Sequence, residues 1–132
     1  MNPTENGSSL SPLIHLLDDD AAVRQSLSLL ISTVGLRVQT WADPQQFLES
    51  FDRQSIGALI LDVRMPDMTG LELHRQLLAL GENYPVIFMS GESLPHETQA
   101  AQNSDAIAFL WKPFRTQQML TAIEQAIQTQ SF

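Results

Sequence analysis

The polar residues best suited to chemistry in this sequence stand at the ends of short apolar runs. Asp18-Asp19-Asp20 follow LIHLL, Asp62 follows ALIL, and Lys112 follows AIAFLW. Lys112 is the only lysine among seven basic residues, so it supplies the one compact ammonium charge. Carboxylates grouped with an ammonium suit a divalent metal and a phosphoryl group, because cations neutralise the charge on a transferring phosphoryl group. The sequence therefore predicts a site for both.

Each of these residues also has a simpler structural explanation. The run Asp18–Asp20 is equally well explained as a helix N-cap, because carboxylates there accept from free backbone amides. Asp62 could instead serve only as a capping or turn residue, and Lys112 only as a solvated cation at a strand end. For both residues we favour the functional explanation over this structural one. Ser90 closes the run VIFM, where its hydroxyl suits either a phosphoryl oxygen or an ordinary turn.

Five apolar runs alternate with five amphipathic stretches, which is the pattern of a doubly wound parallel sheet covered on both faces. The expected strands are Leu13–Leu17, Leu36–Thr40, Ala58–Leu61, Val86–Met89 and Ile107–Trp111. The expected helical stretches are Ala22–Val34, one from Asp43-Pro44, Leu71–Leu80, Leu94–Asn103 and one from Thr116. The first, third and fourth strands are almost wholly apolar, which places them in the sheet centre. The fourth helical stretch has one large apolar residue, Leu94, so we expect it to cover the sheet thinly.

Length and composition narrow the class of protein. The 132 residues suit one domain, and we expect residues 1–12 to form a disordered tail before a domain over residues 13–130. A net charge of −8 predicts that the chain does not bind nucleic acid directly. The longest apolar runs fall far short of the ~20 residues of a membrane span. The polar start and the absence of cysteine predict a cytoplasmic location.

Four segments together resemble the receiver domain of bacterial two-component response regulators, and in particular the FixJ-type transcriptional regulators. These segments are DDD at 18–20, LDVRMPDMTG at 61–70, Ser90-Gly91 and FLWKPF at 109–114. The resemblance extends over about residues 13–130. It implies an α/β, flavodoxin-like fold with a five-stranded parallel sheet in the order 2-1-3-4-5 and five helices. It also implies a signalling domain that catalyses nothing beyond its own phosphorylation and dephosphorylation.

The resemblance further implies a role for each site residue. Asp62 would accept a phosphoryl group from a sensor histidine kinase. Mg²⁺ would be held by Asp18, Asp19, Asp62 and the backbone carbonyl of Arg64. Lys112 would pair with the phosphoryl oxygens, while Ser90 and Phe109 would form the conformational switch.

Two alternatives belong to other classes of protein. A haloacid-dehalogenase-like phosphohydrolase also uses a strand-end aspartate, a lysine and Mg²⁺, but it carries a second acid where this chain has Arg64. A degenerate receiver acting as a protein-interaction module does not require the acidic residues, Ser90 and Lys112, all of which are present.

Aromatic and histidine residues complete the predictions. Trp111 precedes Lys112 and, by strand alternation, shares a face with Ile107 and Phe109. It is our candidate contact for a partner or for a phosphorylation-linked homodimer. We expect His15 to pack inside the first strand, and His74 and His96 to lie on solvated helix surfaces.

Overall fold

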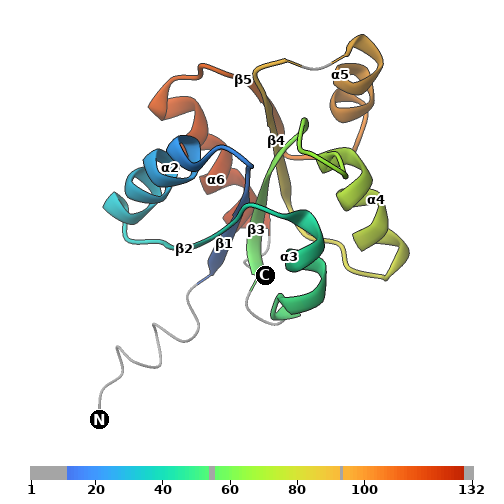
Figure 1. Ribbon diagram of the computed structural model, residues 1–132. Helices are drawn as coiled ribbons and strands as arrows, with labels where there is room; N and C mark the ends of the chain where they lie inside the picture. Colours follow the sequence, from blue (N-terminus) through green and yellow to red (C-terminus); the bar gives the residue numbers. More distant parts are fainter. Residues whose placement is uncertain (1–11, 54–55, 93, 130–132) are drawn as a thin grey trace.

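The computed structural model describes residues 12–53, 56–92 and 94–129 (Figure 1). Most of the tail expected over residues 1–12, and Gln130 at the end of the expected domain, lie outside the described residues. The strands are β1 (Leu13–Leu17), β2 (Arg37–Trp41), β3 (Ile56–Asp62), β4 (Val86–Ser90) and β5 (Ala108–Trp111). The helices are α2 (Ala21–Thr33), α3 (Pro44–Ser50), α4 (Gly70–Ala79), α5 (Pro95–Gln102) and α6 (Thr116–Thr129).

The strands form one parallel sheet in the order β2-β1-β3-β4-β5, as the resemblance implied. All seven residues of β3 and all five of β4 are buried, whereas β5 at the edge is half-exposed. Strands covered on both faces need continuous apolar runs, which β3 and β4 have. The strand β5 is also apolar, and its greater exposure follows from its position at the edge of the sheet. The predicted placement of the apolar strands in the centre is confirmed.

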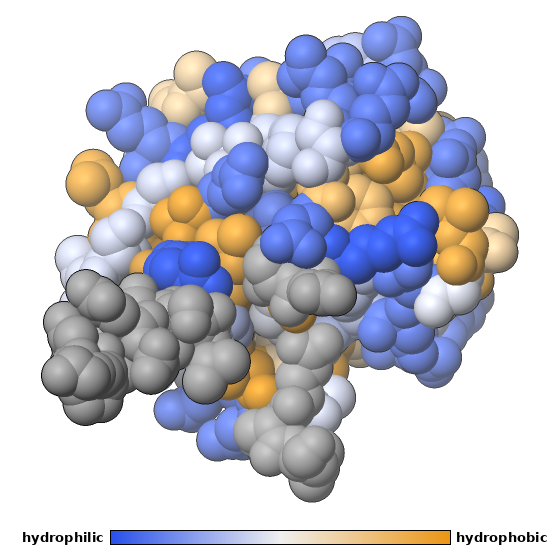
Figure 2. Space-filling model, turned by 90° about the horizontal axis from the view of Figure 1, so that it is seen from below, coloured by the Kyte–Doolittle hydropathy of each residue, from blue (hydrophilic) through white to orange (hydrophobic). Residues whose placement is uncertain are grey.

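Helices cover both faces of the sheet (Figure 1). On one face, α2 and α6 contribute a core of Leu27, Ile31, Met119, Ala122, Ile123 and Ala126. On the other face, α3 and α4 contribute Phe47, Leu71, Leu73 and Leu77. Viewed from below, the surface carries hydrophobic patches separated by hydrophilic residues (Figure 2). Among the described residues, no helix is long and apolar enough to cross a membrane.

The helix α5 is the thinly packed element that the sequence predicted. Its buried residues are Glu97 and Ala101, and the preceding Leu94 is 49% exposed. A helix with so little apolar surface against the sheet gains little free energy from packing. Its position is therefore expected to depend more on polar contacts than that of its neighbours.

Two predictions about packing were wrong. His74 is buried in α4, where its ring meets the Phe88 ring edge-on at 5.7 Å between centroids. Burial lowers the pKa of His74, although the charge of Asp105 opposes this effect. Ile107 precedes β5 and packs with the α2 and α6 face, opposite to Phe109. The face shared by Phe109 and Trp111 is confirmed by an edge-on ring contact at 5.1 Å.

Candidate functional site

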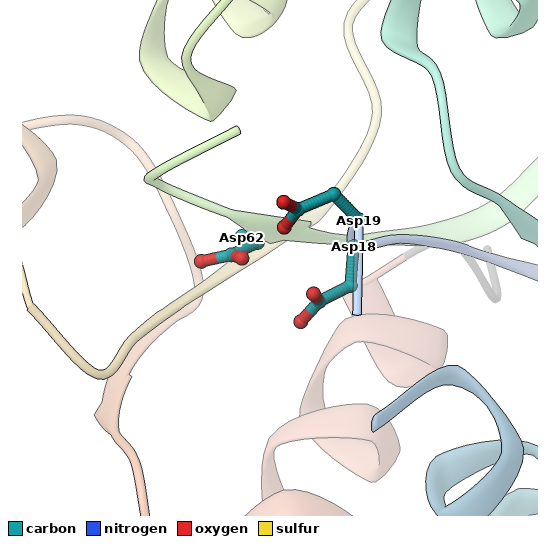
Figure 3. Close-up of side chains that lie close together, drawn as sticks. All are labelled: Asp18, Asp19 and Asp62. Atoms are coloured by element: carbon teal, nitrogen blue, oxygen red, sulfur yellow. The ribbon is translucent and has the colours of Figure 1, made fainter. Parts of the chain in front are cut away.

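Three carboxylates meet at the carboxyl edge of the sheet. Leu17 of β1 is in register with Leu61 of β3, so Asp18 and Asp62, the next residues of the two segments, lie side by side. One oxygen each from Asp18, Asp19 and Asp62 lies within 4.8 Å of the others. Figure 3 shows the three side chains projecting to the same side. Asp18 is fully buried and Asp62 is 5% exposed, so two of the three carboxylates are largely removed from water.

The two explanations of the acidic run apply to different residues within it. The Asp20 carboxylate caps α2 by accepting from the backbone N–H groups of Ala22 and Val23. Asp18 Oδ1 instead accepts from the Asp20 N–H at 2.9 Å, and the other Asp18 oxygen is directed at Lys112. The helix N-cap is thus made by Asp20, whereas Asp18 and Asp19 belong to the carboxylate group.

The ammonium of Lys112 lies between two of these carboxylates. Its Nζ donates to Asp18 Oδ2 at 2.7 Å and lies 3.4 Å from Asp62 Oδ2. The backbone N–H of Lys112 donates to the Ser90 carbonyl at 2.8 Å, and the Lys112-Pro113 peptide bond is cis. Burial acts to lower the pKa of Lys112, but the hydrogen bond to Asp18 and the charge of Asp62 outweigh it and raise that pKa. The lysine therefore stays charged in the site.

The surroundings of Asp62 disfavour its charged form. Burial and then the charge of Asp18 raise the pKa of Asp62 to about 7, against the opposing effects of Lys112 and of the Arg64 N–H. That N–H donates to Asp62 Oδ1 at 3.3 Å. A buried carboxylate beside a like charge is stabilised as an anion by any further cation. The site thus favours binding of a divalent metal.

The start of α4 approaches the backbone of Asp62 very closely at Gly70. A Cβ placed on Gly70 would lie 2.6 Å from the Asp62 carbonyl oxygen and 3.2 Å from Leu61 Cβ. The Gly70 N–H donates to the Val63 carbonyl at 3.1 Å. Glycine allows this approach because it has no side chain. The first residue of α4 therefore packs directly against the backbone of Asp62, and the site has no room there for a side chain.

The remaining predicted residues surround this group. Ser90 is the last residue of β4 and fully buried, and its Oγ has no hydrogen-bond partner among the described residues. A buried hydroxyl without a partner is costly, so it favours a ligand or water that it can bond. Phe109 packs against the α3 and α4 face, and Trp111 beside it is 49% exposed.

Sequence reasoning missed two residues that contact the site. Arg24 of α2 donates from Nη1 to the Asp18 carbonyl oxygen at 2.8 Å, which fixes the backbone that carries the acidic pair. Its position in the first turn of the helix after the acidic run was the available signal. Glu97 of α5 pairs with the Arg64 guanidinium at 2.8 Å. Their separation of 33 residues in sequence left no signal for that pair.

Comparison with known proteins agrees with this geometry. The family model described as the response regulator receiver domain matches residues 14–124. The chain belongs to the response regulator receiver domain family. It is 43% identical over 121 residues to the response regulator protein TodT of Pseudomonas putida, covering 91% of this chain and 53% of TodT. It is 36% identical over 114 residues to the transcriptional regulatory protein FixJ of Bradyrhizobium diazoefficiens, covering 86% of this chain and 56% of FixJ.

Solved structures of receiver domains share the fold. FixJ-N has a TM-score of 0.77 and 30% sequence identity, covering 89% of this chain and 94% of that chain. The response regulator StyR has a TM-score of 0.79 and 36% identity, covering 90% of this chain and 60% of that chain. The chain spans about half the length of the response regulators TodT and FixJ. These similarities confirm the FixJ-type receiver domain that the sequence motifs indicated.

Proposed function

We propose that Asp62 of this receiver domain accepts a phosphoryl group from a phosphohistidine of a sensor histidine kinase. The observation that carries the proposal is the grouping of one lysine with three carboxylates, two of them buried, at the end of the sheet. An Asp62 carboxylate oxygen attacks phosphorus, a P–O bond forms, and the P–N bond to the histidine breaks with its electrons going to the imidazole nitrogen. The products are an aspartyl phosphate and a histidine whose imidazole leaves in its neutral form, with one of its two ring nitrogens carrying a proton.

The residues present fit a magnesium ion. Hard divalent cations take oxygen ligands. Asp18, Asp19 and Asp62 each offer one carboxylate oxygen, and these three oxygens lie within 4.8 Å of one another. We assign the fourth protein ligand to the Arg64 carbonyl. When bound, Mg²⁺ would neutralise charge on the transferring phosphoryl group. It would also favour the ionised form of Asp62, which is the form that attacks.

The protein's own residues would then stabilise the product. The Lys112 ammonium, already held between Asp18 and Asp62, would pair with a phosphoryl oxygen. The unpartnered Ser90 hydroxyl would donate to another. Movement of Ser90 toward the phosphoryl group would free space beside β5, and Phe109 would change its packing in response. This is a two-state switch biased by phosphorylation.

The proposed domain covers residues 13–130, and its output includes contact with a second copy. Trp111 stands half-exposed on the edge strand β5, in ring contact with Phe109. We propose that it anchors a homodimer formed on phosphorylation, because large exposed aromatic side chains are common interface anchors. The cytoplasmic location and the absence of direct nucleic-acid binding stay predictions from the sequence.

Labelling with acetyl phosphate and Mg²⁺ tests the proposed acceptor. Intact mass spectrometry should show one phosphoryl group on the wild type, removed by base or by hydroxylamine as expected for an acyl phosphate, and none on Asp62→Asn. Asp67→Asn, which removes an exposed carboxylate from the same loop, is the matched control and should be labelled normally. Multiple-turnover hydrolysis would instead favour the phosphohydrolase alternative, and absence of any labelling would favour an interaction module. A labelled Asp62→Asn protein would show that the acceptor lies elsewhere.

A further inference from the structure

An ion pair joins the loop after the acceptor residue to the start of α5. Arg64 stands two residues after Asp62, and its backbone N–H donates to Asp62 Oδ1 at 3.3 Å. Its side chain points to the neighbouring helix, where Nη1 donates to Glu97 Oε2 at 2.8 Å. Glu97 is the third residue of α5. A single residue thus contacts both the acceptor carboxylate and the thinly packed helix.

Glu97 is well placed to hold α5. Its side chain is 9% exposed, while the Arg64 side chain is 47% exposed. The second carboxylate oxygen of Glu97 accepts from the Leu94 N–H at 2.8 Å, so one side chain both closes the first turn and binds Arg64. Burial acts to raise the pKa of Glu97, but the hydrogen bonds from Leu94 and Arg64 outweigh it and lower that pKa. Glu97 is therefore charged at neutral pH, and that charge needs a partner.

We infer that Glu97 and the phosphorylated Asp62 compete for the Arg64 guanidinium, so that phosphorylation releases α5. This inference rests on the proposed function, since it requires that Asp62 be the acceptor. At a fixed, saturating Mg²⁺ concentration, phosphorylation adds negative charge and strong acceptor oxygens two residues from Arg64. Guanidinium groups bind such oxygens with paired hydrogen bonds, which favours transfer of Arg64 from Glu97 to the phosphoryl group.

The competition must act in both directions. If phosphorylation weakens the pair between Arg64 and Glu97, then removal of Glu97's charge must strengthen binding of a phosphoryl group at Asp62. The size of the effect is limited by the strength of an ion pair whose arginine is half-exposed. Because α5 buries little apolar surface, loss of this pair is also expected to loosen its first turn.

Binding of beryllofluoride, which mimics the phosphoryl group, tests the competition at saturating Mg²⁺. Glu97→Gln removes the charge and keeps a side-chain oxygen that can accept from the Leu94 N–H. We expect beryllofluoride to bind this variant about two- to fivefold more tightly than the wild type. Glu92→Gln removes an exposed carboxylate five residues earlier and is the matched control for the loss of one negative charge. It should bind beryllofluoride as the wild type does.

The Glu97→Gln substitution made in an Arg64→Gln variant separates competition for Arg64 from simple loosening of α5. Arg64→Gln should weaken binding of beryllofluoride, and adding Glu97→Gln to it should have no further effect, because no guanidinium is left to release. If Glu97 acted only by stabilising α5, its substitution would have the same effect in both backgrounds. Amide exchange gives an independent measurement. Beryllofluoride should speed exchange at the start of α5 in the wild type, whereas in Glu97→Gln exchange should be fast before it is added.

The outcomes distinguish this inference from the proposed function. A wild type that does not bind beryllofluoride with Mg²⁺ contradicts the proposed function, and the inference with it. A wild type that binds it, together with unchanged or weaker binding by Glu97→Gln, overturns the competition alone. Equal gains from Glu97→Gln with and without Arg64 overturn it as well.

Discussion

Asp62 and His15 are both buried ionisable side chains of the central sheet, but their surroundings differ. Asp62 lies at the carboxyl edge beside Lys112 and two other carboxylates. His15 lies in the middle of β1, 1% exposed, where its Nδ1 accepts from Trp41 Nε1 at 2.9 Å and its ring meets that of Phe47. Burial raises the pKa of Asp62 to about 7 and lowers the pKa of His15 to about 4, with a smaller opposing effect of Asp52 on the histidine.

The same physical cause thus favours the neutral form of both groups, with different consequences. Around Asp62, the charge of Lys112 does not offset burial and the charge of Asp18. A bound cation would add to the effect of the lysine and restore the ionised carboxylate that attacks phosphorus. Around His15, the side-chain partner is an uncharged indole, and Nε2 has no hydrogen-bond partner among the described residues. Burial at the sheet edge therefore creates a site that responds to ions. Burial in the sheet interior creates a histidine that is neutral at physiological pH.

The two shifts change the free energy of unfolding in opposite directions as pH rises. Unfolded Asp62 loses its proton near 3.8 and folded Asp62 near 7, so this residue stabilises the fold at low pH and less as pH rises to 7. Unfolded His15 gains a proton below 6.5 and folded His15 below about 4, so this residue destabilises the fold as pH falls from 6.5 to 4. In the metal-free wild type, the two effects oppose each other over that range.

The largest expected effect is that of Asp62→Asn on stability without metal. Because asparagine has no charge to bury, the variant should gain on the order of 4 kcal/mol over the wild type when pH rises from below 4 to above 7. Urea unfolding in chelator at both ends of this range measures the gain. Asp67→Asn, at an exposed position, should show a much smaller change. A gain that did not depend on pH would mean that Asp62 has the same pKa in the folded and unfolded states, and would contradict the raised pKa.

A slightly smaller effect of opposite sign is expected for His15→Asn. Asparagine keeps an acceptor for the Trp41 indole and removes the ring that gains a proton on unfolding. The acid-induced loss of stability between pH 6.5 and about 4 should shrink by on the order of 3 kcal/mol. The same substitution at the exposed His96 is the control. If both variants flatten the profile equally, the buried environment of His15 is not the cause.

The sequence predicted the site at the carboxyl ends of the strands better than the packing of the helices, for a physical reason. Asp62 and Lys112 follow apolar runs, and those runs specify the strands β3 and β5 and the carboxyl ends at which the two residues stand. Burial of His74 was mispredicted as solvated surface because a histidine suits either environment. The signal was nevertheless present, since His74 stands three residues after Leu71 and three before Leu77 on the buried face of α4.

Contacts between elements were the part that the sequence could not predict. The pair of Arg64 and Glu97 depends on how α5 packs against the loop after β3, and neither residue has a neighbour in sequence that indicates it. Ile107 was assigned to β5 because apolar runs do not show where pairing begins. The strand begins at Ala108, whose Cα pairs with Ile87. Ile107 therefore lies outside the regular alternation of β5 and packs on the α2 and α6 face of the sheet, whereas Phe109 packs on the other face.

Gly70→Ala should disturb the burial of Asp62 and leave that of His15 unchanged. The added Cβ would meet the Asp62 carbonyl at 2.6 Å, so the start of α4 must shift outward. We expect a loss of about 1–3 kcal/mol, as for overpacked cores. The shift should also expose Asp62 and lower its pKa toward the ordinary value. Gly91→Ala, whose Cβ would lie at an ordinary 3.7 Å from Lys112, is the control. A fully stable Gly70→Ala protein would contradict this close packing.

The smallest effects are spectroscopic, and the two tryptophans report on the two regions separately. Trp111 directly precedes Lys112 and contacts Phe109, while Trp41 donates to His15 from the opposite edge strand. In Trp41→Phe, beryllofluoride with Mg²⁺ should therefore change the fluorescence, and acidification through about pH 4, where folded His15 gains its proton, should change it little. In Trp111→Phe, acid should change the fluorescence and beryllofluoride should change it little. The reason is that the remaining indole, Trp41, donates a hydrogen bond to the imidazole of His15.

Protein concentration adds a further distinction to this measurement. A Trp111 signal that is independent of concentration reports the switch within one molecule, because Lys112 moves the indole directly. A signal that grows with concentration reports the proposed homodimer, because the half-exposed indole is then covered by a second copy. If beryllofluoride binds and both single-tryptophan proteins respond to it equally, the sheet edge and the sheet interior are coupled. The separation between an ion-responsive edge and an inert interior would then be wrong.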